Sequence, residues 1–321
     1  MIDNKYQLIE KIGLGGSSLV YKATDIDGND YAIKILRKDK EYNNRQGAQM
    51  ICKEHQILSE LHGHSNLIQS YEVNPNGVLE VDGRSEECIY QVTELATNGS
   101  LSNIVRNTGP LEEELARFFI TQILYAVLHL HSKEYAHLDI KLENIFLDEY
   151  FNIKLGDLGS SAHVGSNDGF FDHRRGTPLY MAPEVKSLEP GEEYDAFSSD
   201  MYSLGITLFV MLTGEFPTPS DLGHSFETKE SDEMEDCTSA PKLDQQKIKR
   251  FSHLSSEVIE LIQEMTEEND VGRPQVQDIL ESEWLQKPFS EDICEMAFQE
   301  MEARKNFLLE ECQRHSFKGI F

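Results

Sequence analysis

The stretch HLDIKLENIFLDEYFNIKLGDLG, residues 137–159, places four polar groups at the ends of two short apolar runs. These groups are Asp139, Lys141, Asn144 and Asp157. The runs IFL and IKL predict two short strands joined by a turn through residues 148–152, so the four groups would meet at one edge of a hairpin. Carboxylate and amide oxygens suit Mg²⁺, and a lysine can neutralise charge beside a carboxylate that takes a proton. The pattern indicates phosphoryl transfer to a hydroxyl.

The same stretch resembles the catalytic loop and metal-binding triplet of eukaryotic protein kinases, usually written HRDLxxxN and DFG. Alone it could also be two acidic surface turns, so the identification depends on motifs elsewhere. The resemblance implies that Asp139 is the catalytic base and that Asn144 and Asp157 bind Mg²⁺. Lys141 completes a DxKxxN spacing typical of serine/threonine kinases; the alternative is an ordinary exposed lysine.

Charge and composition limit the partners. The 321 residues can form about two lobes with a sizeable core. A formal net charge of −28 argues against nucleic acid and anionic membranes, and favours protein substrates with basic surfaces. Five cysteines without a CxxC pattern indicate reduced thiols and a cytoplasmic location. The first twelve residues do not read as a signal peptide, and the apolar run at 204–214 is predicted as a buried helix. We expect a monomer.

Glycines punctuate an alternating apolar and polar pattern between Tyr6 and Leu36, which predicts three antiparallel strands. The first turn, GLGGSSLV at 13–20, would let backbone NH groups approach phosphate oxygens. Ser18 stands in place of the third glycine of the kinase pattern GxGxxGxV, and a plain hairpin turn is the alternative. YAIK at 31–34 supports the kinase assignment, because it matches the strand motif VAIK.

Lys34 at the end of this motif needs an anionic partner, because an unpaired buried ammonium is unfavourable. The segment MICKEHQILSELH at 50–62 has the apolar spacing of a helix. By resemblance, Glu54 on this helix pairs with Lys34, which would hold the α and β phosphates of the nucleotide. The alternative is a solvated Glu54, like its neighbour Glu60. Leu58 favours the pairing, since the family packs an apolar residue there against the metal triplet.

A polar turn is predicted at 74–83, and a strand at 89–95 then leads into ATNGSL, a hinge between two lobes. The resemblance implies that backbone groups of the hinge bind adenine. The residues that it places around ATP are Ile12, Gly13, Gly15, Gly16, Val20, Ala32, Lys34, Thr93, Glu94, Ala96 and Asn144.

Apolar residues recur at helical spacing over 110–130 and predict a core helix that leads to the catalytic loop. An activation segment follows Asp157 and ends in GTPLYMAPE at 176–184, which resembles the family's peptide-docking loop. Glu184 in this loop would be buried, and we expect it to pair with Arg273, whose planar fork suits a carboxylate.

Asp200 has two interpretations, as the N-cap of a helix or, by family resemblance, as a brace for the catalytic loop. Leu138 replaces the arginine of HRD, which would normally bind a phosphate on the activation segment. We therefore expect switching by phosphorylation of this segment to be weak or absent. Leu158 replaces the phenylalanine of DFG, a milder change because the side chain is still apolar.

The acidic segment 221–237 is either a mobile solvated loop or a negative rim that attracts basic substrates. By resemblance, Glu143 is the type of residue that pairs with a substrate arginine. Ser100, however, stands where such kinases often have a second glutamate, which puts a strict arginine preference in doubt. After Pro288 the tail predicts an amphipathic helix of open role.

The motifs predict an α+β bilobal protein kinase fold, with a small antiparallel β-sheet lobe at 1–95, a larger, mostly helical lobe at 96–287 and a helical tail at 288–321. The implied activity is that of a serine/threonine protein kinase using ATP and Mg²⁺, nearest to the calcium/calmodulin-dependent-kinase-like branch. The implied catalytic residues are Asp139, Lys141, Lys34 and Glu54.

Two rivals remain at this point. A pseudokinase acting as a nucleotide-binding scaffold is suggested by the degraded positions Ser18 and Leu138. A small-molecule kinase would share the base and metal residues, but it would have no reason to carry the peptide-docking loop.

Overall fold

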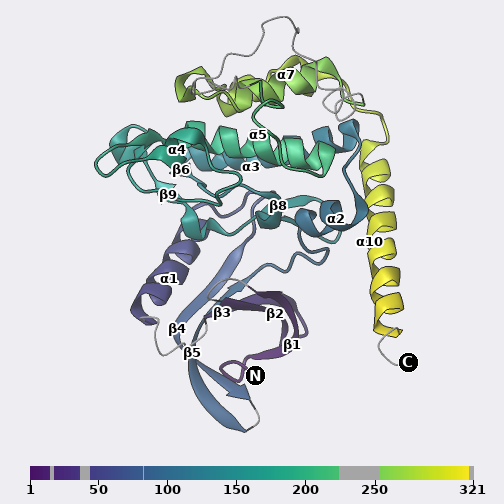
Figure 1. The fold of residues 1–321 in the computed structure, drawn as a ribbon. Coiled ribbons are helices and arrows are strands. Elements are labelled where there is room, and N and C mark those ends of the chain that lie inside the picture. Colours follow the sequence, from purple (N-terminus) through teal and green to yellow (C-terminus); the bar gives the residue numbers. More distant parts are fainter. Residues whose placement is uncertain (15–17, 37–43, 82, 224–252, 318–321) are drawn as a thin grey trace, which may run out of the picture.

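The computed structural model describes residues 1–14, 18–36, 44–81, 83–223 and 253–317. Its small lobe is a five-stranded antiparallel sheet in the order β1-β2-β3-β5-β4, and helix α1 (Asn44–Glu60) contacts β4 and β5 (Figure 1). The strands are β1 (Tyr6–Leu14), β2 (Ser18–Asp25), β3 (Asp30–Leu36), β4 (Ser70–Val81) and β5 (Arg84–Thr93). The three strands predicted from the glycine pattern are confirmed.

The register of this sheet separates a core face from a nucleotide face. Val20 pairs with Lys34, and Ala32 pairs with Thr93, so all four side chains share one face of the sheet. The alternating residues point to the opposite face and form the small core of this lobe. These core residues are Ile33, Ile35, Tyr90 and Val92. The predicted nucleotide residues of the strands are therefore left on the side that does not form this core.

The turn predicted at 74–83 is wrong, because β4 continues to Val81 and pairs there with Arg84 of β5. The N-terminal residues supply extra partners for this polar stretch. Asp3 accepts hydrogen bonds from the Val78 amide at 2.6 Å and from the Asn74 side chain at 2.8 Å. The polar side chains are satisfied within the sheet and do not end the strand.

The large lobe is mostly helical. Its helices are α2 (Leu101–Thr108), α3 (Glu113–Ser132), α4 (Pro183–Ser187), α5 (Ala196–Thr213), α7 (Ser256–Met265), α8 (Val276–Leu280), α9 (Glu283–Gln286) and α10 (Ile293–Phe317). The short strands are β6 (Tyr135–Ala136), β7 (Ile145–Leu147), β8 (Ile153–Leu155), β9 (Ala162–His163), β10 (Phe170–Phe171) and β11 (Tyr194–Asp195). Turns of 3-10 helix are η1 (Leu142–Asn144), η2 (Leu158–Ser160), η3 (Gly165–Asn167) and η4 (Asp270–Gly272).

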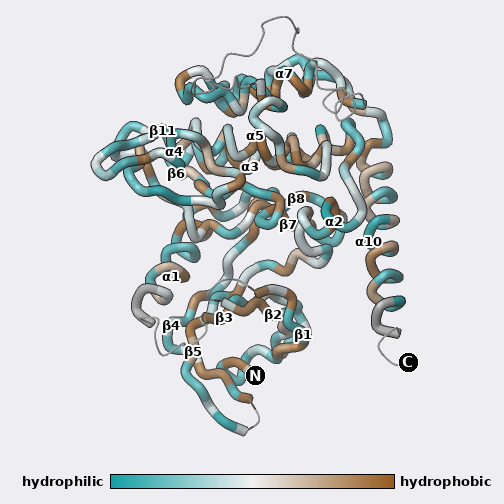
Figure 2. The backbone as a smooth tube through the Cα atoms, in the orientation of Figure 1, coloured by the Kyte–Doolittle hydropathy of each residue, from teal (hydrophilic) through white to brown (hydrophobic). Residues whose placement is uncertain are grey.

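Helices α3 and α5 form the centre of the large lobe. Figure 2 shows brown, apolar segments along both, whereas α10 alternates between brown and teal. Helix α5 has the length and apolar composition of a membrane span, but 89% of that stretch is buried inside the protein. The buried helix predicted at 204–214 is confirmed as part of α5. Its burial gives a rigid base for the loops that end at the site.

The tail forms the predicted helix, α10, which runs along the outer side of the large lobe past α2 (Figure 1). Arg304 fixes it by donating to the Thr108 hydroxyl at 2.8 Å and to the Gly109 carbonyl at 2.9 Å. Phe298 lies edge-on to Phe151, with ring centroids 5.5 Å apart. The first turns of α10 are therefore docked on the large lobe.

Candidate active site

The predicted hairpin is present and carries the catalytic loop. Strands β7 and β8 pair antiparallel, with Ile145 opposite Leu155 and Leu147 opposite Ile153. Asp148 closes the turn, accepting from the Tyr150 and Asn152 amides at 2.9 and 2.8 Å. All four strand residues just named are buried. The apolar runs anchor the hairpin, and the polar groups at its open end are brought together.

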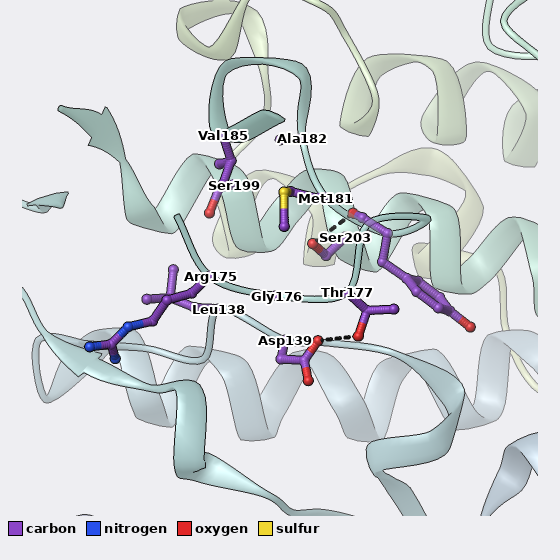
Figure 3. A pocket seen from close by; sticks show the side chains of 11 residues that line it. Leu138, Asp139, Arg175, Gly176, Thr177, Met181, Ala182, Val185, Ser199 and Ser203 are labelled. Carbon is purple, nitrogen blue, oxygen red and sulfur yellow. Dashed lines mark hydrogen bonds between the residues drawn. The ribbon is translucent and has the colours of Figure 1, made fainter. Parts of the chain in front are cut away.

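Asp139 lies at the centre of these polar groups. Lys141 donates to one Asp139 carboxylate oxygen at 2.7 Å, and the Thr177 hydroxyl donates to the other at 2.8 Å. Lys141 also donates to the Thr177 oxygen at 2.6 Å, which closes a three-membered network. Figure 3 shows the Asp139 and Thr177 side chains joined by this hydrogen bond, and both residues line the pocket drawn there. This carboxylate can therefore accept a hydrogen bond from an aliphatic hydroxyl.

Thr177 belongs to the predicted peptide-docking loop at 176–184, but its contact with Asp139 was not predicted. Two residues that are distant in sequence meet because Gly176 lets the chain approach the catalytic loop. Gly176 has φ +107°, and a Cβ there would lie 2.7 Å from the Leu138 carbonyl oxygen. Only glycine tolerates both the positive φ and this approach. The signal was present in the GTP of the docking-loop motif.

Asn144 and Asp157 offer the oxygen ligands that a Mg²⁺ site needs. The Asn144 side-chain NH₂ donates to the Asp139 carbonyl at 2.9 Å, which leaves the amide oxygen for a cation. Among the described residues, no cluster of three or more His, Cys, Asp and Glu side chains could hold a metal alone. One carboxylate and one amide oxygen suit Mg²⁺, which takes its remaining ligands from water and phosphates. The residues fit this ion.

Asp157 has an unusual backbone and a perturbed carboxyl. Its φ is +57°, a left-handed conformation for a residue with a Cβ. Burial acts to raise the pKa of Asp157, but the positive charge of Lys34 and its hydrogen bond hold the pKa below the ordinary value. The carboxyl is therefore ionised at neutral pH and available to a cation.

Lys34 connects the two lobes. Its ammonium donates to Glu54 of α1 at 2.8 Å and to Asp157 at 3.4 Å. Burial acts to lower the pKa of Lys34, but the two carboxylates prevail and raise it. Burial raises the pKa of Glu54, which is 7% exposed. The pair expected from the resemblance is present, and the solvated alternative for Glu54 is wrong.

Asp200 braces the catalytic loop and is not an N-cap. Helix α5 begins at Ala196, and Asp195 caps it by accepting from two backbone amides. The fully buried Asp200 instead accepts from the His137 and Leu138 amides, both at 2.8 Å. Since Leu138 has φ +64°, these bonds hold a strained backbone beside Asp139.

The predicted Glu184–Arg273 pair is present in the base of the peptide-docking loop. Two guanidinium nitrogens donate to the two carboxylate oxygens at 2.6 and 2.8 Å. The Arg273 side chain has no exposed surface. The loop is therefore tied to η4 by a two-pronged, charge-assisted contact.

The hinge and the glycine turn complete the predicted nucleotide residues. Ala32 on β3 pairs with Thr93 on β5. Gly13 on β1 packs closely on Val20 of β2, because a Cβ on Gly13 would lie 3.2 Å from the Val20 Cβ. Thr93, Glu94 and Ala96 are partly exposed, and Ile12 is exposed. The Glu94 amide is already bonded to the Gln69 carbonyl at 2.8 Å. Gly15 and Gly16 lie outside the described residues, as does most of the acidic segment 221–237.

Glu143 lies at the rim of the site and already interacts with two other side chains. Arg106 approaches it at 3.5 Å, and the Tyr180 hydroxyl donates to it at 3.3 Å. Ser100 caps α2 by accepting from the Asn103 amide at 3.4 Å. These contacts give both residues a structural role besides any contact with a substrate.

Comparison with known proteins agrees with this geometry. Residues 6–285 match the family model described as the protein kinase domain. The chain is 31% identical over 295 residues to CBL-interacting serine/threonine-protein kinase 3 of Arabidopsis thaliana, covering 91% of this chain and 60% of that protein. It is 33% identical over 286 residues to the probable cell cycle serine/threonine-protein kinase CDC5 homolog of Encephalitozoon cuniculi (strain GB-M1), covering 88% and 55%.

CBL-interacting protein kinase 32 of Oryza sativa subsp. japonica is 33% identical over 288 residues, with 89% of this chain and 60% of that protein covered. The chain thus spans little more than half the length of these relatives. The bilobal α+β architecture, the ordered motifs and the family match lead to one conclusion: this chain belongs to the protein kinase domain family.

Proposed function

We propose that this protein is a serine/threonine protein kinase that transfers the γ-phosphate of ATP to serine and threonine hydroxyls of protein substrates. One observation carries the proposal: the Asp139 carboxylate already accepts a 2.8 Å hydrogen bond from a threonine hydroxyl while Lys141 holds its other oxygen. A substrate hydroxyl offered at the same carboxylate would meet a base within hydrogen-bond reach.

The other residues divide the work by charge. Lys34, held by Glu54, supplies a positive charge for the α and β phosphates. Lys141 would neutralise charge that develops on the transferred group beside Asp139. Mg²⁺, when bound by Asn144 and Asp157, supplies further neutralisation of the phosphates. The residues of the chain thus contribute mainly positioning and electrostatic stabilisation.

The proposed substrates are proteins with basic surfaces. The formal net charge of −28 would attract them over distance. A strict arginine requirement is not part of this proposal, because Arg106 already approaches Glu143 and Ser100 caps a helix.

We also propose a monomer in the cytoplasm. The cysteine pattern of the sequence supports the location, and sedimentation analysis would test the oligomeric state.

The test is Mg²⁺-dependent transfer of labelled γ-phosphate from ATP to a degenerate serine/threonine peptide library. We expect transfer by the wild type and a loss of roughly 10²–10⁴-fold in Asp139→Asn, since general-base catalysis has that size. Asp148→Asn, in the hairpin turn away from the network, is the matched control for the loss of one carboxylate. Equal rates for Asp139→Asn and wild type would contradict the role of Asp139. Nucleotide binding without transfer by the wild type would support the scaffold alternative instead.

A further inference from the structure

The residue before the catalytic base is a leucine, and this raises the question of what orders the activation segment. Leu138 is 5% exposed and has no side-chain donor. Its backbone amide is bonded to Asp200. The segment from Asp157 to Glu184 must nevertheless keep Thr177 at Asp139, because that contact places the peptide-docking loop.

Arg175 supplies the missing cation from within the segment itself. One of its guanidinium nitrogens donates to the Ser160 carbonyl at 2.7 Å and to the Ser161 carbonyl at 3.1 Å. Its guanidinium carbon also lies 4.8 Å from the centre of the Phe171 ring. Ser160 and Ser161 follow the metal triplet directly, whereas Arg175 precedes the docking loop. A single side chain therefore joins the two ends of the activation segment.

Ser161, one of the two residues whose carbonyls Arg175 binds, is itself held in place. Ser161 is fully buried, and its hydroxyl donates to the His137 carbonyl at 3.2 Å. Lys53 of α1 donates to the same Ser161 carbonyl at 3.1 Å. The anchor point is thus held by the catalytic loop on one side and by the small-lobe helix on the other. Because Arg175 binds the Ser161 carbonyl, its guanidinium is fixed relative to both lobes.

Arg175 lies two residues before Thr177, so its position affects the active site through a short stretch of backbone. Gly176 lies close to the Leu138 carbonyl, and the Thr177 hydroxyl donates to Asp139. In Figure 3 the Arg175 side chain points away from the Asp139–Thr177 pair. It therefore does not touch Asp139 but holds the backbone that brings Thr177 to Asp139.

We propose that Arg175 is a positioning residue that holds the activation segment in its phosphate-transferring conformation without phosphorylation of that segment. This inference rests on the proposed kinase function. Its physical basis is that a guanidinium is charged at every physiological pH and makes charge-assisted hydrogen bonds to carbonyls, whereas a phosphate clamp needs an added group. In this protein the contact is made by a side chain of the segment and needs no modification.

The experiment compares Arg175→Gln with Arg174→Gln, an adjacent change of equal charge at an exposed arginine that donates to the Leu188 carbonyl. For Arg175→Gln we expect kcat/KM for a peptide substrate to fall roughly ten- to hundredfold, the size of a lost charge-assisted hydrogen bond. Binding of ADP with Mg²⁺ should be unchanged, because Lys34 and Asp157 are not altered. Arg174→Gln should stay within about twofold, as for a surface change.

Two further measurements separate positioning from general stability. Arg175→Lys keeps a donor, so it should recover part of the lost kcat/KM, which a general loss of stability would not predict. Wild-type protein treated with phosphatase, and shown by mass spectrometry to carry no phosphate on 157–184, should keep its activity. That arm needs no variant, so it tests the inference even if Arg175→Gln fails to fold.

The outcomes distinguish this inference from the proposed function. Equal kcat/KM for Arg175→Gln and wild type would overturn the role of Arg175 while leaving the kinase function intact. Loss of wild-type activity on phosphatase treatment would do the same. Absence of transfer in every wild-type sample would instead remove the proposed function on which the inference rests.

Discussion

Two ion pairs, Arg273–Glu184 in the large lobe and Lys34–Glu54 in the small lobe, join the same kinds of charge in different ways. Arg273 donates to Glu184 from two nitrogens and to the Glu267 carbonyl from the third at 2.8 Å, and its side chain has no exposed surface. Lys34 meets Glu54 at one point, lies 3.4 Å from Asp157 and is 26% exposed.

The difference separates a structural contact from a chemical one. A planar fork whose donors are all engaged has nothing left for a ligand, so the Arg273 pair can only hold the docking loop on η4. An ammonium with three donors and two carboxylate partners from different elements can still receive a phosphate. The same comparison predicts which variants unfold the protein and which leave it folded but inactive.

The largest expected effect is on stability, in Arg273→Ala. Removing the guanidinium leaves the Glu184 carboxylate without its partner, which should reduce the free energy of unfolding by about 3–5 kcal/mol. Urea denaturation followed by circular dichroism measures it. Arg273→Lys keeps the charge but loses the two-pronged contact, so its free energy of unfolding should lie between those of the wild type and Arg273→Ala. A loss below about 1 kcal/mol in Arg273→Ala would show that the pair is not a structural link.

The next effect is on catalysis, in Lys34→Met. We expect kcat/KM to fall roughly 10²–10³-fold, because a preorganised charge on the phosphates is lost. The free energy of unfolding should fall less than in Arg273→Ala, since Glu54, whose pKa is already raised by burial, can take a proton in place of the lost partner. Lys34→Met combined with Glu54→Gln should restore stability but not activity. Recovery of activity in the double variant would break the distinction.

A smaller effect is the pH dependence due to Glu54. Its pKa in the folded state is raised above the ordinary 4.5, so its contribution to stability is complete below 4.5 and is lost as the pH rises through the folded-state pKa. The activity follows the opposite direction, because protonation removes the charge that holds Lys34. We expect kcat/KM to decline on acidification while the pH is still above 4.5. Glu54→Gln should show a lower rate without this decline; an identical acid limb in both would assign it to another group.

The smallest effect is predicted for an exposed ion pair, which serves as a reference for the three larger effects predicted above. Arg314 on α10 pairs with Glu310 at 3.1 Å and with Glu311, and its side chain is 60% exposed. Arg314→Ala should change the free energy of unfolding by about 0.5 kcal/mol or less and leave kcat/KM unchanged. A loss comparable to that of Arg273→Ala would mean that exposure does not separate the two kinds of pair.

The sequence by itself determined the residues of the site and the order of the elements. Asp139, Lys141, Asn144 and Asp157 were identified from the linear motif, because the two apolar runs that anchor the hairpin lie beside them in the chain. The pairing of Lys34 with Glu54 was implied by the resemblance to protein kinases, and that of Glu184 with Arg273 followed because a buried carboxylate in the docking loop needs a cation. Side-chain chemistry and periodicity located these residues, and the family resemblance supplied their roles.

Only the tertiary structure decided which backbone groups those side chains meet. The clamp from Arg175 to the Ser160 carbonyl, the brace from Asp200 to two loop amides and the anchor from Arg304 to the Gly109 carbonyl all end on the main chain. Likewise, β4 extends through a polar stretch because Asp3 from the N-terminus bonds to its backbone. Every residue except proline carries the same NH and C=O groups, so a sequence names the donor but not the carbonyl that faces it. That choice is made when distant segments pack.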